Sequence, residues 1–386
     1  MKGSFPIEKF NTVRTPFYYY DTELLRKTLD TIKAETGKND NYHVHYAVKA
    51  NANRKLLRII SAAGFGADCV SGGEIKACLD AGFPAEKIVF AGVGKSDWEI
   101  NVGLDAGIAY FNVESIPELE VINQLAGEKD KIARVSFRIN PDVGAHTHAN
   151  ITTGLAENKF GIAMADMEKV IEIAASLKHV EFVGLHFHIG SQIRQMEVFE
   201  NFCLKVNTIK QWFADQGIEI QYLNLGGGLG VDYNHPDAEP IPDFASYFDT
   251  IHRTLRPDPH QQILFELGRS LVAQCGELIT RVLYTKKNAL GRDVALVDAG
   301  MTDLIRPALY QAHHKIECLT SQGTECSYMI GGPVCESSDI FDQAAMLPQL
   351  KRGDLLTIRT AGAYGSAMAS RYNLRDLPRS IYSDEL

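Results

Sequence analysis

Residues 43–51 are His-Val-His-Tyr-Ala-Val-Lys-Ala-Asn, a β-prone run (Val44–Val48) that ends directly at Lys49. An amphipathic stretch follows at Leu56–Ala63, and a second short apolar run follows at Ala67–Val70. A strand, a helix and another strand in this order are the unit from which parallel sheets are built. This opening therefore predicts an α/β fold.

The same alternation continues to about residue 268. Eight runs are β-prone, and most are continuous apolar stretches, as expected for strands buried on both faces. They are Val44–Val48, Ala67–Val70, Lys87–Ala91, Ala109–Val113, Arg134–Ile139, Phe182–His188, Tyr222–Leu225 and Ile263–Glu266. The helical stretches between them include Leu56–Ala63, Gly73–Ala81, Pro117–Ala126 and Asp166–Leu177. This pattern predicts a (β/α)8 TIM-type barrel rather than a doubly wound sheet, which usually has fewer strands.

The pattern changes after about residue 268. Leu271–Tyr284, Val294–Val297 and Leu355–Arg359 are β-prone but have no helices of matching length between them. With the β-prone residues 15–20 they predict a second domain resembling a β-sandwich or β-barrel. We therefore expect residues 1–25 to be a strand segment that joins the β domain, residues 26–268 to form the barrel, and residues 269–386 to form the C-terminal β domain.

Composition narrows the class of protein. The chain has 386 residues, 45% of them hydrophobic and 23% charged, as in ordinary globular proteins. A net charge of -9 argues against nucleic acid as a partner. No apolar run approaches the roughly 20 residues of a membrane span, and the N-terminus lacks a signal-peptide core. The seven cysteines form no C-x-x-C pair, so we expect no metal and reduced thiols in the cytoplasm.

Residues able to do chemistry follow several predicted strands. Lys49 stands where a barrel places its active site, and a desolvated lysine is a nucleophile, although most lysines are simply exposed. Gly226-Gly-Gly-Leu-Gly230 can direct backbone N–H groups toward an anion, or can simply form a tight turn. His186 and His188 lie on one face of a strand and could bind zinc, but no third ligand at a sensible spacing supports this. His188 can instead stack on a flat cofactor with Ser191 donating to a phosphate, and a hydrogen-bonded core pair is the alternative.

Three later segments also have two interpretations each. In Glu266-Leu-Gly-Arg269 the carboxylate can face a pyridine nitrogen, or the two charges can form a structural salt bridge. Cys335-Glu336 offers a proton-donating thiol, or an inert buried cysteine. Arg306 and Tyr310 share a face if their segment is helical, but Pro307 lies between them. The guanidinium of Arg306 can bind a substrate carboxylate with two parallel hydrogen bonds, or Arg306 can simply be a solvated arginine.

Together these segments resemble the fold-type III pyridoxal phosphate (PLP) decarboxylases. The matching motifs are Tyr46–Asn51, His188–Gln192, Gly226–Gly230, Glu266–Arg269, Cys335–Asp339 and Gly362–Met368. The resemblance extends from Thr15 to Asn373, and the family combines a (β/α)8 barrel with a C-terminal β domain. One departure is Leu267, where the family usually has proline; leucine restores an N–H that proline lacks.

The resemblance implies a role for each matching residue. Lys49 forms the covalent link to PLP, His188 stacks on its ring, Glu266 faces its pyridine nitrogen, and Asp68 lies near it. Its phosphate is held by Ser191, Gly227, Gly228 and Tyr364, and the loop containing Gly268 and Arg269 lines the cofactor. Cys335 protonates the substrate carbon. In the family Cys335 and Glu336 come from the partner subunit, which implies a homodimer with shared sites.

Within the family, Thr153–Gly161 resembles the diaminopimelate branch. This implies decarboxylation of the amino acid meso-2,6-diaminopimelate at its D-centre to give L-lysine and CO2. Arginines suit its distal carboxylate, which ornithine lacks, and an acid suits its distal ammonium. The implied substrate-binding residues are Arg269, Arg306, Tyr310, Glu336 and Tyr364. The alternatives are an ornithine, arginine or carboxynorspermidine decarboxylase, a racemase, which needs a base on each face of the ring, or a PLP-binding barrel without catalysis.

Overall fold

The computed structural model describes residues 5–141 and 159–386, and these divide into two compact units. The barrel unit comprises the described residues of Leu29–Gly230 and Asp243–Gly268. The β unit comprises the described residues up to Thr28, together with Val231–Pro242 and Arg269–Leu386.

The barrel unit is a closed ring of parallel strands. In order around the ring they are β2 (Tyr42–Ala47), β3 (Gly66–Cys69), β4 (Ile88–Phe90), β5 (Tyr110–Val113), β6 (Ala133–Arg138), β7 (Val180–His186), β8 (Tyr222–Asn224) and β9 (Gln262–Leu267). The ring closes where β9 pairs with β2, with Ile263 opposite Tyr42. Each of the eight predicted runs overlaps one of these strands, so the predicted (β/α)8 barrel is confirmed.

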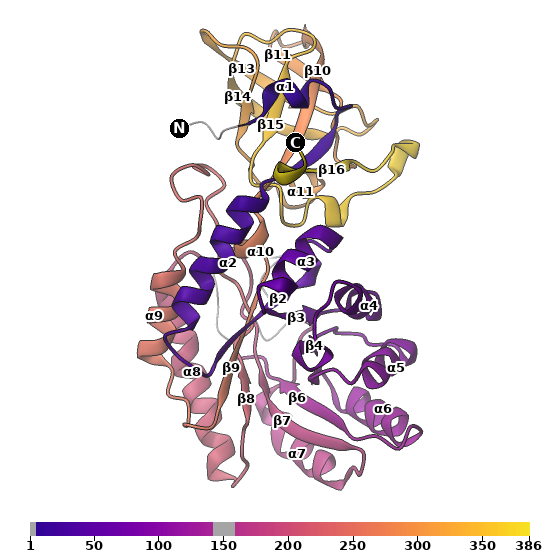
Figure 1. Ribbon diagram of the computed structural model, residues 1–386, viewed down its shortest axis with the longest axis vertical. Coiled ribbons are helices and arrows are strands. Elements are labelled where there is room, and N and C mark those ends of the chain that lie inside the picture. Colours follow the sequence, from indigo (N-terminus) through magenta and orange to yellow (C-terminus); the bar gives the residue numbers. More distant parts are fainter. Residues whose placement is uncertain (1–4, 142–158) are drawn as a thin grey trace. The chain divides into compact units, whose positions relative to one another are not determined.

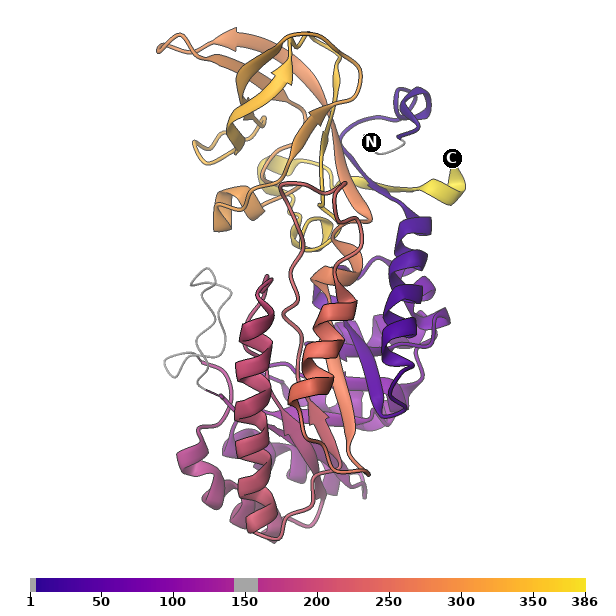
Figure 2. The same cartoon turned by 90° about the vertical axis from the view of Figure 1, so that its left-hand side faces the viewer.

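Helices lie along the outside of this ring (Figure 1). They include α2 (Thr22–Thr36), whose residues from Leu29 on belong to the barrel unit, and α3 (Arg54–Ala62), α4 (Gly72–Asp80), α5 (Asp97–Ala106), α6 (Ile116–Gly127), α7 (Met167–Ser176), α8 (Met196–Asp215) and α9 (Phe244–Thr254). Helices α8 and α9 run side by side (Figure 2). Ser71 and Ser115 cap α4 and α6 by accepting hydrogen bonds from backbone N–H groups, only two residues after β3 and β5 end. These short turns leave the C-terminal ends of the strands at one rim.

The β unit is built mainly from strands. They are β1 (Phe17–Tyr20), β10 (Gly276–Lys287), β11 (Asp293–Val297), β12 (Ile316–Cys318), β13 (Glu325–Gly331), β14 (Ile340–Pro348), β15 (Leu355–Ile358) and β16 (Arg379–Tyr382). The main path is β12-β15-β10-β11-β13-β14, and β1 pairs antiparallel with β10 and parallel with β16. The expected sheet-rich second unit is confirmed. Its first predicted strand began too early, because Leu271 and Val272 are buried in a short helix, α10 (Arg269–Val272).

One segment lies in a different unit from the one its sequence position suggested. Val231–Pro242 falls inside the range 26–268 that we assigned to the barrel, but it clusters with the β unit. Within that unit the Asp237 carboxylate pairs with Arg359 at 2.7 Å, and the Tyr233 hydroxyl accepts a hydrogen bond from Arg269 at 2.6 Å. The segment contains no helix or strand, so it has no periodic pattern that could have revealed its place.

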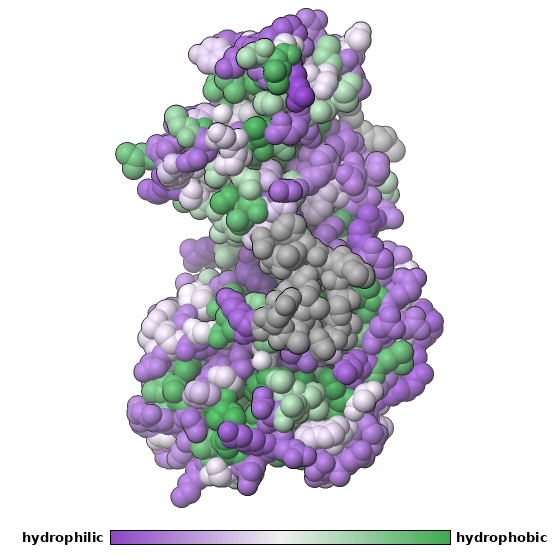
Figure 3. Space-filling view, turned by 180° about the vertical axis from the view of Figure 1, so that it is seen from behind, coloured by the Kyte–Doolittle hydropathy of each residue, from purple (hydrophilic) through white to green (hydrophobic). Residues whose placement is uncertain are grey.

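Among the described residues, no helix combines the length and the apolar character that a membrane crossing requires. On the face drawn in Figure 3, hydrophilic residues predominate and hydrophobic residues form scattered patches. This surface agrees with the composition, in which charged residues of both signs are frequent.

Candidate active site

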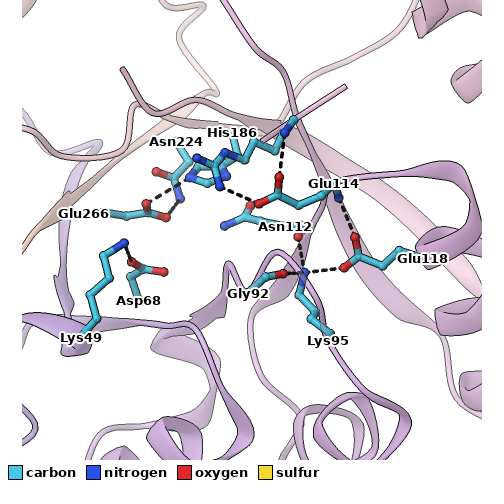
Figure 4. A network of polar contacts seen from close by, with 12 residues as sticks. Lys49, Asp68, Gly92, Lys95, Asn112, Glu114, Glu118, His186, Asn224 and Glu266 are labelled. Carbon is cyan, nitrogen blue, oxygen red and sulfur yellow. Dashed lines mark hydrogen bonds and ion pairs between the residues drawn. The ribbon is translucent and has the colours of Figure 1, made fainter. Parts of the chain in front are cut away.

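A lysine amine faces a buried carboxylate at the C-terminal rim of the barrel unit. Lys49 lies in the short turn Val48–Ala50 that follows β2, and its side chain is 40% exposed. Its Nζ atom is 4.0 Å from Oδ2 of Asp68 in the neighbouring strand β3. Figure 4 shows this amine and the carboxylates of Asp68 and Glu266 directed into the same space.

Asp68 is fully buried, and neither of its carboxylate oxygens has a hydrogen-bond partner among the described residues. Burial and the charge of Glu266 raise the pKa of Asp68 well above its usual range, while the charge of Lys49 partly opposes them. Buried polar atoms in folded proteins are nearly always hydrogen-bonded, so two such oxygens indicate a place for water or a ligand.

Glu266, by contrast, is fully paired. Its Oε2 lies 3.0 Å from Nε2 of His186, and its Oε1 accepts a hydrogen bond from Nδ2 of Asn224 at 2.7 Å. Burial alone would raise the pKa of Glu266, but the charge and hydrogen bond of His186, together with Lys49, lower it to about 2. Adjacent strands β7, β8 and β9 thus hold one permanent negative charge at the rim.

The glycine loop after β8 passes close to its neighbours. Gly226 and Gly228 have φ angles of +65° and +116°, which favour glycine. A Cβ atom at Gly227 would lie 2.1 Å from the carbonyl oxygen of Glu266. The Gly227 N–H donates to Nδ1 of His188 at 3.3 Å, and burial with the charge of Lys49 lowers the pKa of His188 well below its usual range. The loop therefore lies against a neutral imidazole, and only glycine fits there.

A second polar network, not predicted from the sequence, joins the ends of β4, β5 and β6 (Figure 4). Arg138 donates to Glu114 at 2.5 Å, and the Gly161 N–H donates to the other oxygen of Glu114 at 2.7 Å. The backbone N–H of Glu114 donates to Glu118 at 2.7 Å. Lys95 binds Glu118 and two backbone carbonyl oxygens. These bonds fix the strand ends on one side of the rim.

In the β unit two buried guanidinium groups share one tyrosine. Arg269 and Arg306 are each 6% exposed. Nη1 of Arg269 donates to the Tyr233 hydroxyl at 2.6 Å, and the guanidinium of Arg306 lies 4.8 Å from the centre of the Tyr233 ring. Arg269 also lies 4.9 Å from the centre of the Tyr364 ring. No sequence pattern marked Tyr233, which belongs to the segment Val231–Pro242.

The segment from Arg306 to Tyr310 is helical. It forms α11 (Arg306–Tyr310), and Pro307 lies in its first turn, where the missing N–H of proline costs no helical bond. Arg306 contacts the Tyr233 ring and hydroxyl and the His314 ring, none of which is a carboxylate. Burial lowers the pKa of Arg306, and the nearby charge of Arg269 adds to this effect.

Cys335 and Glu336 lie in an exposed loop after β13. The Cys335 N–H donates to the Asn373 side chain at 3.3 Å, and the Tyr372 hydroxyl donates to Glu336 at 2.7 Å. The thiol is therefore free and accessible in the described chain, not an inert buried group.

The remaining predicted residues lie in loops beside the rim or outside the described chain. Ser191 is partly buried in the loop after β7. A Cβ atom at Gly268 would lie 3.1 Å from the Cβ atoms of Ala47 and Ala50, so this loop packs closely on the Lys49 turn. Leu267 is 1% exposed and ends β9. Thr153–Gly161 lies outside the described residues except for its last three. No group of three or more potential metal ligands occurs in the described ranges.

The comparisons with known proteins agree with this geometry. Residues 23–273 match the family model of the pyridoxal-dependent decarboxylases, pyridoxal binding domain. Diaminopimelate decarboxylase from Bacteroides thetaiotaomicron is 61% identical over 386 residues, which is 100% of each chain. The crystal structure of diaminopimelate decarboxylase from Helicobacter pylori complexed with L-lysine has a TM-score of 0.92 at 40% identity, covering 98% of this chain and 94% of that chain.

An arginine decarboxylase from Paramecium bursaria Chlorella virus has a TM-score of 0.86 at 21% identity, covering 97% of this chain and 98% of that chain, and shares the fold alone. The resemblance identified from the sequence motifs is confirmed: the chain belongs to the pyridoxal-dependent decarboxylases and, within them, to the diaminopimelate decarboxylases.

Proposed function

We propose that this protein removes the carboxylate from the D-centre of meso-diaminopimelate and releases CO2 and L-lysine, with PLP as its cofactor. The observation that carries the proposal is a group of three side chains at the barrel rim. The Lys49 amine lies there beside the Asp68 carboxyl, which accepts no hydrogen bond from any described residue, and near the Glu266 carboxylate, which is held charged by His186. The 61% identity to a diaminopimelate decarboxylase over the full chain supports the choice of substrate.

The residues at the rim fit PLP. When bound, PLP supplies a protonated ring that accepts the electrons of the breaking bond. Lys49 would hold the cofactor covalently, and His188 would pack against it. Glu266, which is hydrogen-bonded to His186 and Asn224, would keep its ring nitrogen protonated. The residues proposed to hold the phosphate and line the site are Asp68, Ser191, Gly227, Gly228, Gly268, Arg269 and Tyr364.

The β unit supplies the proposed substrate selectivity. Burying a guanidinium without a carboxylate is unfavourable, so the environment of Arg306 is suited to an anionic ligand. We assign Arg306, with Arg269, Tyr310 and Tyr364, to the distal carboxylate, and Glu336 to the distal ammonium. Ornithine has no distal carboxylate and would leave the Arg306 guanidinium without an anionic partner.

Cys335 is the proposed proton donor to the substrate carbon that has lost its carboxylate. A proton donor works best away from bulk water, yet this thiol is exposed in the described chain. The Cys335 backbone N–H donates to the Asn373 side chain, and the residues on either side of Asn373 are exposed, Tyr372 to 49% and Leu374 to 97%. We therefore propose a homodimer in which a second copy covers this surface. The described cysteines are all free, which agrees with a reducing cytoplasm.

The deciding experiment incubates purified protein and PLP with meso-diaminopimelate, ornithine or arginine and measures both CO2 and the amine product. We expect L-lysine from meso-diaminopimelate and little CO2 from the other two. No CO2 from any of them would contradict decarboxylation, and equal release from ornithine would contradict the substrate assignment.

Two experiments test the covalent link and the dimer. Borohydride should fix PLP on Lys49 and on no other lysine. The variant Lys87→Ala, in which an exposed lysine is removed, serves as the control and should be labelled normally.

The shared site is tested by mixing two variants, Lys49→Ala and Cys335→Ala, each of which should be inactive alone. After free exchange of protomers the mixture should regain about a quarter of the parent activity, because half the dimers contain one intact site. A mixture that stays inactive contradicts the shared site.

A further inference from the structure

Arg306 is oriented by uncharged groups. Its guanidinium lies 4.8 Å from the centre of the Tyr233 ring, and its Nη1 atom is 2.7 Å from Nε2 of His314. None of these contacts, within the described part of the β unit, supplies a negative charge. Its direction is therefore fixed while its charge remains available.

His314 is 1% exposed and uses both ring nitrogens. A guanidinium carries only hydrogen-bond donors, so the Nε2 atom that faces Arg306 must be an acceptor. The ring proton then lies on Nδ1, which donates to the backbone carbonyl of Arg359 at 2.9 Å. The Tyr233 ring packs against a third side, with the ring centres 5.0 Å apart and the planes at 76°. The imidazole is thus held in one tautomer and one orientation.

The backbone that anchors His314 is itself held in place. The side chain of Arg359 pairs with three carboxylates of the β unit, at distances of 2.6 to 2.9 Å. Burial, with the charge of Arg306, lowers the pKa of His314 to about 3. The ring therefore remains a neutral acceptor at neutral pH.

We propose that His314 is a positioning residue, which orients the Arg306 guanidinium without neutralising it and so leaves its other N–H groups available to the distal carboxylate of the substrate. This inference rests on the proposed function, in which Arg306 binds that carboxylate. An acidic residue at position 314 would also orient the guanidinium, but it would compete with the substrate for the same charge. A neutral imidazole avoids this competition.

Three substitutions separate positioning of Arg306 from a purely structural role. His314→Gln places an amide oxygen close to the position of Nε2 and keeps an acceptor for Arg306. His314→Asn places an amide N–H close to the position of Nδ1 and keeps the donor to the Arg359 carbonyl. His314→Leu keeps neither bond.

Binding of L-lysine, measured by calorimetry on the PLP-loaded protein, includes the contacts of the distal end, because decarboxylation leaves that end unchanged. We expect the Asn and Leu variants to weaken L-lysine binding and to raise the KM for meso-diaminopimelate about tenfold, with a smaller change in kcat. The Gln variant should stay within about twofold of the parent. The absorbance of bound PLP should be the same in all four proteins.

The opposite ranking, with Asn near the parent and Gln impaired, would overturn the inference and assign His314 a structural role through Arg359. Equal losses in Gln and Asn would also overturn it. In an Arg306→Ala background, His314→Asn should cause no further loss, and a second tenfold loss contradicts the inference. If the Leu variant does not fold, the Gln and Asn pair decides alone.

Failure of the proposed function is distinguishable from failure of this inference. A parent protein that releases no CO2 from meso-diaminopimelate overturns the function, and an Arg306→Ala variant with normal KM overturns the carboxylate assignment. An active parent, an impaired Arg306→Ala and an unaffected His314→Asn overturn the inference alone.

Discussion

Two arginines of the β unit, Arg359 and Arg306, are equally buried but have opposite surroundings. Arg359 is 5% exposed and Arg306 is 6% exposed. Arg359 pairs with Asp237 at 2.7 Å, Glu277 at 2.9 Å and Glu317 at 2.6 Å. Arg306 contacts an aromatic ring, a hydroxyl and an imidazole. Burial therefore does not reveal what a charged residue does, whereas the charge of its partners does.

The difference has a simple physical meaning. Burial alone would lower the pKa of Arg359, but its three carboxylates outweigh burial and raise it, so the folded chain itself supplies the counter-charge. For Arg306, burial lowers the pKa and no described carboxylate offsets the cost. A guanidinium of this second kind is stabilised by an anion that arrives with a ligand. The first arginine should govern stability and the second should govern substrate binding.

The largest expected effect is on stability. Arg359→Met should lower the free energy of unfolding by about 3–5 kcal/mol, because it leaves buried carboxylates without their partner. Urea unfolding measures this loss, with Arg292→Met as an exposed control that should change stability by less than about 0.5 kcal/mol. If Arg359→Met unfolds like the parent, the three ion pairs of Arg359 do not stabilise the fold. The assignment of Arg359 to stability would then be wrong.

The next effect is on turnover. A charged hydrogen bond in a desolvated site contributes about 1.5–3 kcal/mol, so Arg306→Ala should lower kcat/KM for meso-diaminopimelate roughly ten- to a hundred-fold. Stability and PLP absorbance should stay close to those of the parent. Arg306→Lys keeps the charge but loses the planar guanidinium, so its kcat/KM should lie between those of the parent and Arg306→Ala.

Steady-state kinetics with meso-diaminopimelate and ornithine check this expectation. Ornithine should be a poor substrate of the parent, and Arg306→Ala should not make it poorer, since ornithine has no distal carboxylate to lose. A variant impaired equally on both substrates would show that Arg306 acts on the whole site, and the assigned selectivity would be wrong.

The barrel and its rim were predictable because their signals are local in the sequence. Each strand carries its own apolar run, and Lys49 and Glu266 stand at or just beyond the ends of such runs. The partners of the two arginines are not local. Arg269 and Tyr233 are 36 residues apart, and Arg359 and Asp237 are 122 apart.

Tyr233 and Asp237 also lie in a segment with no regular element, so no periodicity marked them. His314 could not have been selected either, since its role depends on a tautomer that only the two bound nitrogens reveal. The network of Lys95, Glu114 and Arg138 was also missed, because it joins the ends of strands that are far apart in the sequence.

The smallest expected effect concerns the residue that connects the two arginines, because His314 accepts from the Arg306 side chain and donates to the Arg359 backbone. Its pKa is about 3 in the folded chain, below its usual value of 6.5. As the pH falls, His314 takes up a proton in the unfolded chain before it does so in the folded chain. The stability that comes from burying a neutral His314 is therefore complete above pH 6.5 and declines toward pH 3.

Between about pH 7 and about pH 5.5 the parent should therefore lose on the order of 1 kcal/mol that can be attributed to His314. His314→Gln cannot take up this proton, so its stability should change less over the same interval, even if it is lower throughout. The other histidines titrate in both proteins, so the difference between the two urea-unfolding profiles isolates this one. Parallel profiles would mean that His314 titrates normally in the folded chain. The inference that a neutral imidazole connects the two arginines would then be wrong.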